Sequence, residues 1–200
     1  MFCRFAAPLR FPLLVIFMGL VAGGQHGTPG LTPSLVAARQ GARVDGRAVA
    51  PERSDPEQAL VQDSEMEDRF FSLGLGGSVT VAFDCALTDG PGPELRLFEV
   101  TNPNPAYPIE RAEVYALVDG DAFRLGAAES QPQDATARVT AQYVDLGAAA
   151  DAEGQPVRLR QAQRFRIVDV TDPARFRSRP NADGFDLDGV EALQRCPPAL

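Results

Sequence analysis

The sequence predicts an all-β protein folded as a single β-sandwich, and three observations lead to this prediction. Its 200 residues are enough for one domain of ordinary size, since domains usually contain about 100 to 200 residues. From residue 70 onward, short stretches of alternating apolar and polar residues recur, separated by turn residues. No stretch of a dozen residues carries a convincing apolar helical stripe, which argues against an alternating α/β sheet.

The first 23 residues have the pattern of a secretory signal peptide. Arg4 and Arg10 precede an apolar run over 11–22, and small residues end that run. The run is shorter than the roughly 20 residues that a membrane-spanning helix needs. We therefore expect cleavage near Gly23, no membrane span afterwards, and a secreted or periplasmic protein. A single N-terminal anchor helix is the alternative.

The mature chain is expected to begin with a flexible lead-in over 24–53, because Gly, Ala, Pro, Thr and Arg occur there without a sustained apolar period. The β-sandwich domain follows over 54–193, and 194–200 form a C-terminal tail. At the start of the domain, 54–57 predict a short capped helix or turn, with a proline at the first helical position.

About eight strands are expected in the domain. The stretch 78–84 alternates most clearly, since Val79, Val81 and Phe83 fall on one face. The clearest hairpin joins 111–118 to 122–125 through Asp119-Gly120. The remaining strands are expected at 70–73, 94–101, 138–146, 164–170 and 184–193.

Composition excludes several functional classes. The chain has 19 arginines, no lysine and a net charge of −8, so a nucleic-acid surface is not expected, because such surfaces depend on clustered positive charge. The one histidine, His26, lies beside the expected cleavage site, which leaves no Ser-His-Asp or Cys-His arrangement and no zinc site. We therefore expect no enzyme and name no catalytic residues.

Cysteine usage agrees with export. Cys3 leaves with the signal peptide, whereas Cys85 and Cys196 would mature in an oxidising compartment, where disulfides persist. We predict a Cys85–Cys196 disulfide. Two separate thiols are the alternative.

Six motifs follow one another along the chain: FSLGLGGS at 71–78, DGPGP at 89–93, FEVT at 98–101, the hairpin over 115–125, RIVDVT at 166–171 and ADGFDLD at 182–188. In this order they resemble a largely uncharacterised β-sandwich domain of secreted and cell-surface bacterial proteins, over about 54–193. Its architecture is similar to the galactose-binding-like jelly roll of discoidin domains and many carbohydrate-binding modules. Members of that class are mostly non-catalytic and commonly hold one structural calcium ion.

Calcium is therefore the cofactor that the resemblance implies. In the jelly-roll class the ion usually joins the loop before the first strand to a carboxylate on the last, which implies Asp55 and Glu191 as ligands. Asp183, Asp186 and Asp188 are a second candidate set, because calcium prefers carboxylate and carbonyl oxygens. A solvated acidic loop with Asx turns is the alternative for this set, and a glycosidase acid/base pair is a third.

Glu99 and Tyr107 are the candidate ligand-binding residues. Glu99 lies in an otherwise apolar strand, where an unpaired carboxylate is costly to bury. It is expected either to contact a ligand or to pair with an arginine, with three candidates: Arg96, Arg111 and Arg166. Tyr107 lies in a proline-rich loop and is available to stack on a sugar, whereas Tyr115 and Tyr143 are expected in the core.

Together these features predict an exported, non-catalytic binding module with a structural calcium, whose partner is an extracellular glycan or cell-envelope polymer. This ligand class rests on the resemblance. A structural or adhesive cell-surface domain that contacts proteins is the alternative, and a carboxylate-based glycoside hydrolase is the third hypothesis.

Overall fold

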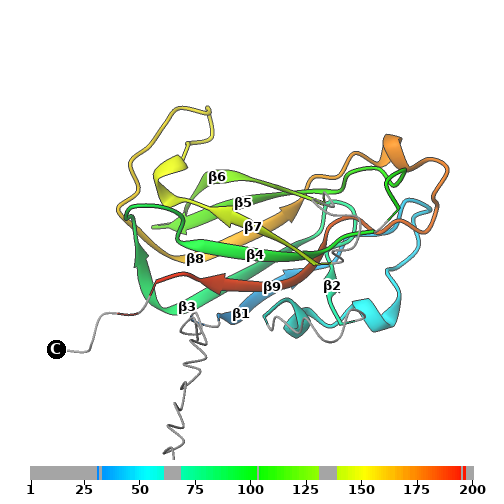
Figure 1. The fold of residues 1–200 in the computed structure, drawn as a ribbon, viewed down its shortest axis with the longest axis horizontal. Helices are drawn as coiled ribbons and strands as arrows, with labels where there is room; N and C mark the ends of the chain where they lie inside the picture. Colours follow the sequence, from blue (N-terminus) through cyan, green and yellow to red (C-terminus); the bar gives the residue numbers. More distant parts are fainter. Residues whose placement is uncertain are drawn as a thin grey trace, which may run out of the picture.

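Two antiparallel β-sheets pack face to face in the computed structural model (Figure 1). The structure describes residues 31, 33–60, 69–102, 104–130, 139–194 and 196, so the expected signal peptide lies outside the described residues. Within the described part of the chain, no helix has the length and apolar character that crossing a membrane requires.

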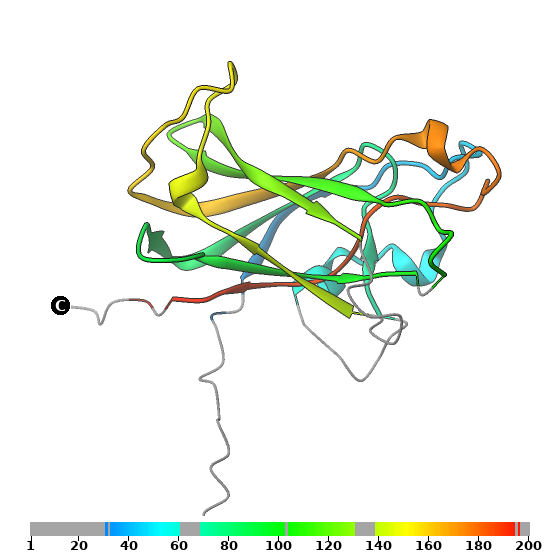
Figure 2. The same cartoon turned by 45° about the horizontal axis from the view of Figure 1, so that its top comes forward.

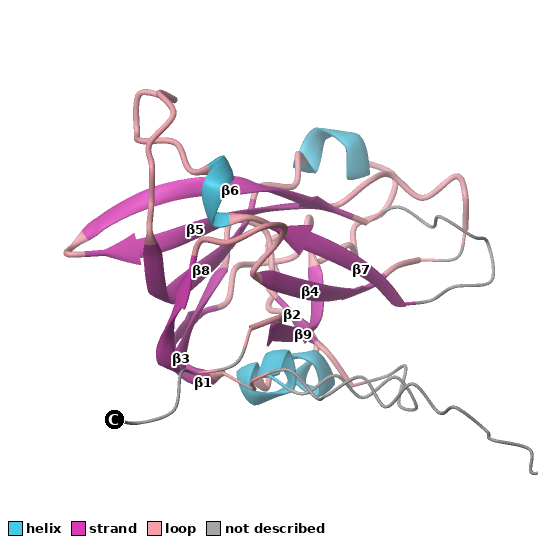
Figure 3. Cartoon of the chain, turned by 60° about the vertical axis from the view of Figure 1, so that its left-hand side comes forward, coloured by secondary structure: helices cyan, strands magenta, loops and turns pink. Residues whose placement is uncertain are grey.

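Five strands form one sheet and four form the other, and Figure 3 shows the two layers. In spatial order, the five-stranded sheet consists of β1 (Ser34–Arg39), β3 (Ser78–Thr88), β8 (Gln161–Asp169), β5 (Arg111–Val118) and β6 (Asp121–Glu129). The four-stranded sheet consists of β2 (Phe71–Ser72), β9 (Asp186–Ala192), β4 (Leu95–Val100) and β7 (Val139–Val144). Four short 3-10 helices complete the fold: η1 (Pro51–Arg53), η2 (Pro56–Leu60), η3 (Leu146–Ala148) and η4 (Pro173–Phe176).

The core lies between the sheets and follows from the alternation in the strands. In β3, Val79, Val81 and Phe83 are buried, as their spacing of two predicts. Phe83 meets Phe165 of β8 edge to face, with ring centroids 5.9 Å apart. Leu97 of β4 is also part of this core, which joins the two layers.

The predicted β-sandwich is confirmed. Each of the eight predicted strands overlaps one of the strands β2 to β9. The predicted hairpin joins β5 to β6, and its turn residues Asp119 and Gly120 have φ values of 54° and 96°. Positive φ at both turn positions matches the right-handed twist of the flanking strands.

The structure differs from the prediction of a flexible lead-in over 24–53. Ser34–Arg39 forms β1, which pairs antiparallel with β3 at the edge of the five-stranded sheet. Five of its six side chains are exposed, so the segment has no apolar alternation from which a strand could be inferred. Backbone hydrogen bonds to β3 hold it, and the sandwich therefore begins before residue 54.

The predicted disulfide is confirmed. Cys85 of β3 is bonded to Cys196, beyond β9, with their Cα atoms 5.6 Å apart. The bond links residues 111 positions apart and ties β3 to the C-terminal end of the last strand. This end of the sandwich is the opposite one from the loops described next (Figure 1).

Candidate functional site

Three loops gather at one end of the sandwich, which we call the loop end: residues 40–53, 101–110 and 170–185 (Figure 2). Hydrogen bonds link them to one another. Val44 N donates to Ala182 O at 2.9 Å, and Arg179 Nη2 donates to Ala106 O at 3.2 Å. The loop end is thus a connected structure on the scaffold of the two sheets.

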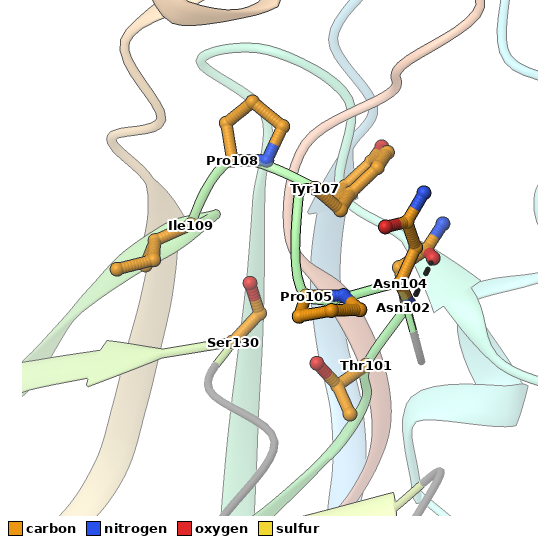
Figure 4. Close-up of a pocket in the computed structure, with 8 residues that line it drawn as sticks. All are labelled: Thr101, Asn102, Asn104, Pro105, Tyr107, Pro108, Ile109 and Ser130. Atoms are coloured by element: carbon orange, nitrogen blue, oxygen red, sulfur yellow. Dashed lines mark hydrogen bonds between the residues drawn. The ribbon is translucent and has the colours of Figure 1, made fainter. Parts of the chain in front are cut away.

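A small pocket lies in the loop end. Its volume is about 180 Å³. Figure 4 shows the lining residues, which come from the loop between β4 and β5 and from the residue after β6. They are Thr101, Asn102, Asn104, Pro105, Tyr107, Pro108, Ile109 and Ser130.

Asparagine side chains shape the pocket loop by closing turns on its backbone. Asn102 Oδ1 accepts a hydrogen bond from Asn104 N at 3.0 Å, and Asn104 Oδ1 accepts one from Ala106 N at 2.9 Å. Pro105 and Pro108 restrict the backbone further, because the proline ring fixes φ. Local interactions therefore restrict the conformation of the pocket wall.

Tyr107 is half-buried at this pocket, and contacts on several sides fix its ring. The ring meets Phe176 of η4 edge to face at 5.5 Å, and the Arg179 guanidinium lies 4.7 Å from its centroid. Its hydroxyl donates to Glu110 Oε1 at 3.1 Å. Burial, followed by the negative charge of Glu110, raises the pKa of Tyr107 far above its usual value, so the hydroxyl stays protonated.

Next to Tyr107 lies a group of four buried carboxylates, which we call the acidic cluster: Glu99, Glu110, Asp183 and Asp186. Their exposed fractions are 0, 2, 5 and 9 % respectively. Strand register brings part of the group together, since Glu99 of β4 pairs with Leu187 of β9, the residue after Asp186. Three segments thus place carboxylates at the same end of the sandwich: β4, the residue before β5, and the stretch that leads into β9.

Few donors reach the acidic cluster. Thr140 Oγ1 of β7 donates to Glu99 Oε2 at 3.1 Å, and Tyr107 donates to Glu110 as described. Arg53 Nη1 lies 3.4 Å from Asp183 Oδ2 and forms the one ion pair with the cluster among the described residues. Ser72 of β2 is a further side-chain hydrogen-bond partner of Asp183 and Asp186. One cationic side chain and three hydroxyl groups thus face four carboxyl groups.

Burial dominates the electrostatics of the cluster. It raises the pKa of Glu99 well above its usual value, and the neighbouring charge of Asp186 raises it further. The pKa of Glu110 is raised by burial, then by Asp186 and Glu99. The pKa of Asp186 is raised by burial and then by Asp183. Each carboxylate thus makes its neighbours harder to ionise.

The structure brings together four of the residues that the sequence singled out: Glu99, Tyr107, Asp183 and Asp186. Glu110 was missed, because a single glutamate before a predicted strand gives no sign that it is buried. Asp188, the remaining member of the predicted aspartate set, is buried in β9.

The two residues implied by the resemblance lie in other surroundings. Asp55 is exposed and accepts a hydrogen bond from Glu57 N at 3.1 Å, at the start of η2. Glu191 accepts from Arg96 Nε at 2.9 Å. Their role as calcium ligands stays a prediction.

The expected pairing of Glu99 with an arginine is wrong, since its described donor is Thr140. Of the three arginines considered, Arg96 pairs with Glu191, Arg111 pairs with Glu129, and Arg166 lies over the Tyr115 ring. Each arginine lies on an outer face of its sheet, where its charge reaches solvent.

A second group of carboxylates lies near the start of β4 and the end of β7: Asp89, Glu94 and Asp145. One oxygen from each lies within 4.8 Å of the others. Glu94 is buried and accepts from Gly90 N at 3.0 Å and from Leu146 N at 2.8 Å. This carboxylate group could hold a metal ion. Sequence reasoning missed it, because its members are up to 56 positions apart and each looks like an ordinary turn residue.

The expectation that Tyr143 packs in the core is also wrong. Its exposed fraction is 59 %, and it lies on β7 opposite Arg96 of β4. The alternation in β7 places Val144 inside, so its neighbour Tyr143 faces outward. Tyr143 is thus an exposed aromatic residue away from the pocket lining.

No protein-family profile matches the chain, and no curated protein does. Among solved structures, a pectin-binding carbohydrate-binding module is similar, with 12 % identity and a TM-score of 0.47, covering 82 % of this chain and 94 % of that one. The CBM32 module of AlyQ, solved in complex with 4,5-unsaturated mannuronic acid, has 11 % identity and a TM-score of 0.45, covering 81 % and 97 %. SpGH29 has 10 % identity and a TM-score of 0.43, covering 84 % of this chain, which spans 28 % of its length. The likeness concerns the β-sandwich alone.

Proposed function

We propose that this protein is a non-catalytic glycan-binding module and that the pocket of the loop end is its site. The observation that carries the proposal is the lining of that pocket. Tyr107 and the prolines offer apolar surface, while asparagine amides and the hydroxyls of Thr101 and Ser130 offer hydrogen bonds. A sugar ring has apolar C–H faces and a rim of hydroxyls, so it matches both parts of this lining.

The pocket favours a single neutral sugar ring. Its volume of about 180 Å³ is smaller than the roughly 300–1,000 Å³ of pockets for drug-sized ligands. None of its lining residues is charged. A uronic acid or sulfated sugar would lose hydration of its anionic group without gaining an ionic partner. We therefore propose a neutral glycan, bound by a terminal or branching residue.

Binding is favoured over hydrolysis because the nearby carboxylates are buried. A glycosidase needs two carboxyl groups that reach the scissile bond from opposite sides. The members of the acidic cluster are at most 9 % exposed, and none of them lines the pocket. The adhesive alternative gains no support either, since the large exposed apolar side chains among the described residues are scattered: Val36, Tyr143, Val170 and Leu193.

A structural calcium ion is part of the proposal, with Asp89, Glu94 and Asp145 as ligands. Calcium lies about 2.3–2.6 Å from its oxygen ligands, so two ligands of one ion are at most about 5 Å apart. The spacing of these three carboxylates meets that limit. Asp55 and Glu191 remain the ligands that the sequence resemblance implies.

Export is also part of the proposal. It is supported by the Cys85–Cys196 disulfide, because structural disulfides persist in secreted and periplasmic proteins.

An array of neutral and acidic oligosaccharides tests the proposed function, probed with the wild-type protein and two variants. We expect neutral glycans to be bound, with an affinity at least 10-fold lower for Tyr107→Ala. Tyr143→Ala is the matched control, since it removes an exposed tyrosine from another surface and should bind like wild type. Equal melting temperatures of the variants would show that both are folded. Loss of binding in Tyr143→Ala alone, or no binding by the wild type, would contradict the proposal.

A further inference from the structure

We infer that the outer face of the five-stranded sheet carries a second binding site, for a glycan whose sugar units bear carboxylates, at Arg164 and Arg166 of β8. We call these two arginines and the pocket beside them the arginine face. This pocket shares no lining residue with the pocket of the loop end. The inference therefore does not depend on whether the loop end binds a neutral sugar.

Strand periodicity turns the two arginines toward the same side of the sheet. Phe165 and Ile167 of the same strand are buried in the core, so Arg164 and Arg166 lie on the opposite face of β8. This strand is the third of five in its sheet, which places both arginines at the middle of the outer face. Residues two apart in a strand are separated by about 6.5 Å. One ligand chain can therefore reach both guanidinium groups.

Neither of these arginines has a counter-ion among the described residues. Three arginines elsewhere in the two sheets are paired with a neighbouring carboxylate: Arg96 with Glu191, Arg111 with Glu129, and Arg124 with Glu113. The chain has more acidic than basic residues, so carboxylates are plentiful in it. The charge of the two central arginines is nevertheless left for an external anion.

Contacts hold the Arg166 guanidinium in place while leaving its hydrogen bonds unused. It lies 5.8 Å from the centroid of the Tyr115 ring on β5, and the Tyr115 hydroxyl donates to Glu113. Arg166 Nε is sealed from solvent and donates no hydrogen bond within the part of the chain that the structure describes. Buried polar groups nearly always have a partner, so this exception requires an explanation. A carboxylate bound at the half-buried guanidinium would supply an acceptor to this group.

The pocket of the arginine face lies at the end of the sheet opposite the loop end. Its volume is about 350 Å³, and Arg164 lines it together with Gln161, Gln163 and Asp119. Strand β5 begins directly after the 101–110 loop and leads to the turn at Asp119, so its length separates the two pockets. One protein molecule could therefore hold a ligand at each end.

The wall of this pocket has a defined shape. The register between β3 and β8 shifts after Ala82, and Gln163 Nε2 donates to Phe83 O at 2.8 Å in this irregular stretch. The disulfide of Cys85 fixes the stretch further, and the next residue, Ala86, lines the pocket. Tertiary contacts thus shape the pocket before a ligand binds.

The lining defines the chemical class of the ligand. An arginine binds a carboxylate through two parallel hydrogen bonds, whereas glutamine amides and the Asp119 carboxylate suit hydroxyl groups. A uronic acid offers one carboxylate and several hydroxyls on each sugar ring. A densely charged polymer such as polyphosphate would be repelled by Asp119 and by the net charge of −8. The arginine face therefore favours a uronic acid glycan.

Calorimetric titration with uronic acid oligosaccharides tests the inference, and the same oligosaccharides with their carboxyl groups reduced to alcohols are the comparison. We expect the reduced form to bind at least 10-fold more weakly, and binding of the acidic form to weaken as salt is added. Arg164→Gln and Arg166→Gln should each weaken binding at least 10-fold. Arg175→Gln is the matched control, since it removes the same charge from an exposed arginine of η4 at the loop end, and it should bind like wild type.

Equal melting temperatures of the three variants would show that they are folded. Tyr107→Ala should bind the acidic oligosaccharides like wild type, which separates this site from the loop-end pocket. Equal losses in Arg164→Gln and Arg175→Gln would overturn the inference, as would equal binding of the reduced sugars or of polyphosphate, or no binding of the acidic sugars. Absence of neutral-glycan binding with this binding intact would count against the loop-end pocket alone.

Discussion

A single glycine beside Asp169 illustrates how individual residues determine the loop end. Gly184 has φ near +80°, and a Cβ atom at this position would lie 2.6 Å from Asp169 Oδ2. That oxygen accepts the backbone N–H of Phe185, which holds the loop before β9 against the end of β8. The ADGFDLD motif thus requires glycine at position 184 for two physical reasons: the positive φ of its backbone and the Asp169 carboxylate next to it.

Gly184→Ala is expected to destabilise the protein by about 3 kcal/mol or more. A left-handed backbone at a non-glycine residue costs about 1–2 kcal/mol, and the clash with a buried, hydrogen-bonded carboxylate adds to it. Gly154→Ala is the matched control, since Gly154 has φ near +78° but nothing within 4 Å of its Cβ position. Denaturant unfolding of both variants measures the two effects. Equal losses of stability would show that the contact with Asp169 is unimportant.

Whether a strand can be predicted from the sequence depends on how much of it is buried. Strands with one face in the core, such as β3 and β5, alternate visibly and were predicted. The edge strand β1 was missed, because its side chains are mostly exposed and its stability comes from backbone pairing. The hairpin between β5 and β6 was predicted because Asp119-Gly120 is a local signal that needs no information about distant residues.

The candidate site was only partly predictable for a related reason. Glu99 was singled out because a carboxylate inside an apolar strand is unusual, and Tyr107 because its loop is rich in proline. Their meeting with Glu110 depends on how β4, β5 and β9 are arranged in space, which residue spacing does not reveal. The group of Asp89, Glu94 and Asp145 was missed for the same reason.

The acidic cluster makes the stability of the folded molecule depend on pH. Burial raises the folded-state pKa of Glu99, Glu110 and Asp186 well above their usual values. Between the ordinary carboxyl pKa of about 4 and these raised values, the folded protein binds more protons than the unfolded chain. The stability that comes from this extra proton binding is fully present below the pKa of the carboxyl groups in the unfolded chain. It is lost as the pH rises through their pKa in the folded protein.

We therefore expect the free energy of unfolding in EDTA to be higher at pH 5 than at pH 8. At Asp45 and Glu113, burial raises the pKa, but hydrogen bonds and nearby arginines outweigh it and lower the pKa overall. These two carboxyl groups therefore change the free energy of unfolding below about pH 4.5, outside the range from pH 5 to pH 8. Urea titrations at both pH values measure the difference. Glu99→Gln should reduce the difference, because it removes a carboxyl group whose pKa is raised in the folded protein. A stability that rises from pH 5 to pH 8 in EDTA would rule out this role of the cluster.

NMR shows most directly whether the loop end binds a neutral glycan. The measurement is a titration of the ¹⁵N-labelled protein with the neutral oligosaccharides, followed by backbone amide shifts. We expect shift changes concentrated in residues 101–110 and at Ser130, which line or adjoin the pocket. Changes concentrated on the outer face of either sheet, such as around Tyr143, or no changes at saturating sugar, would contradict it.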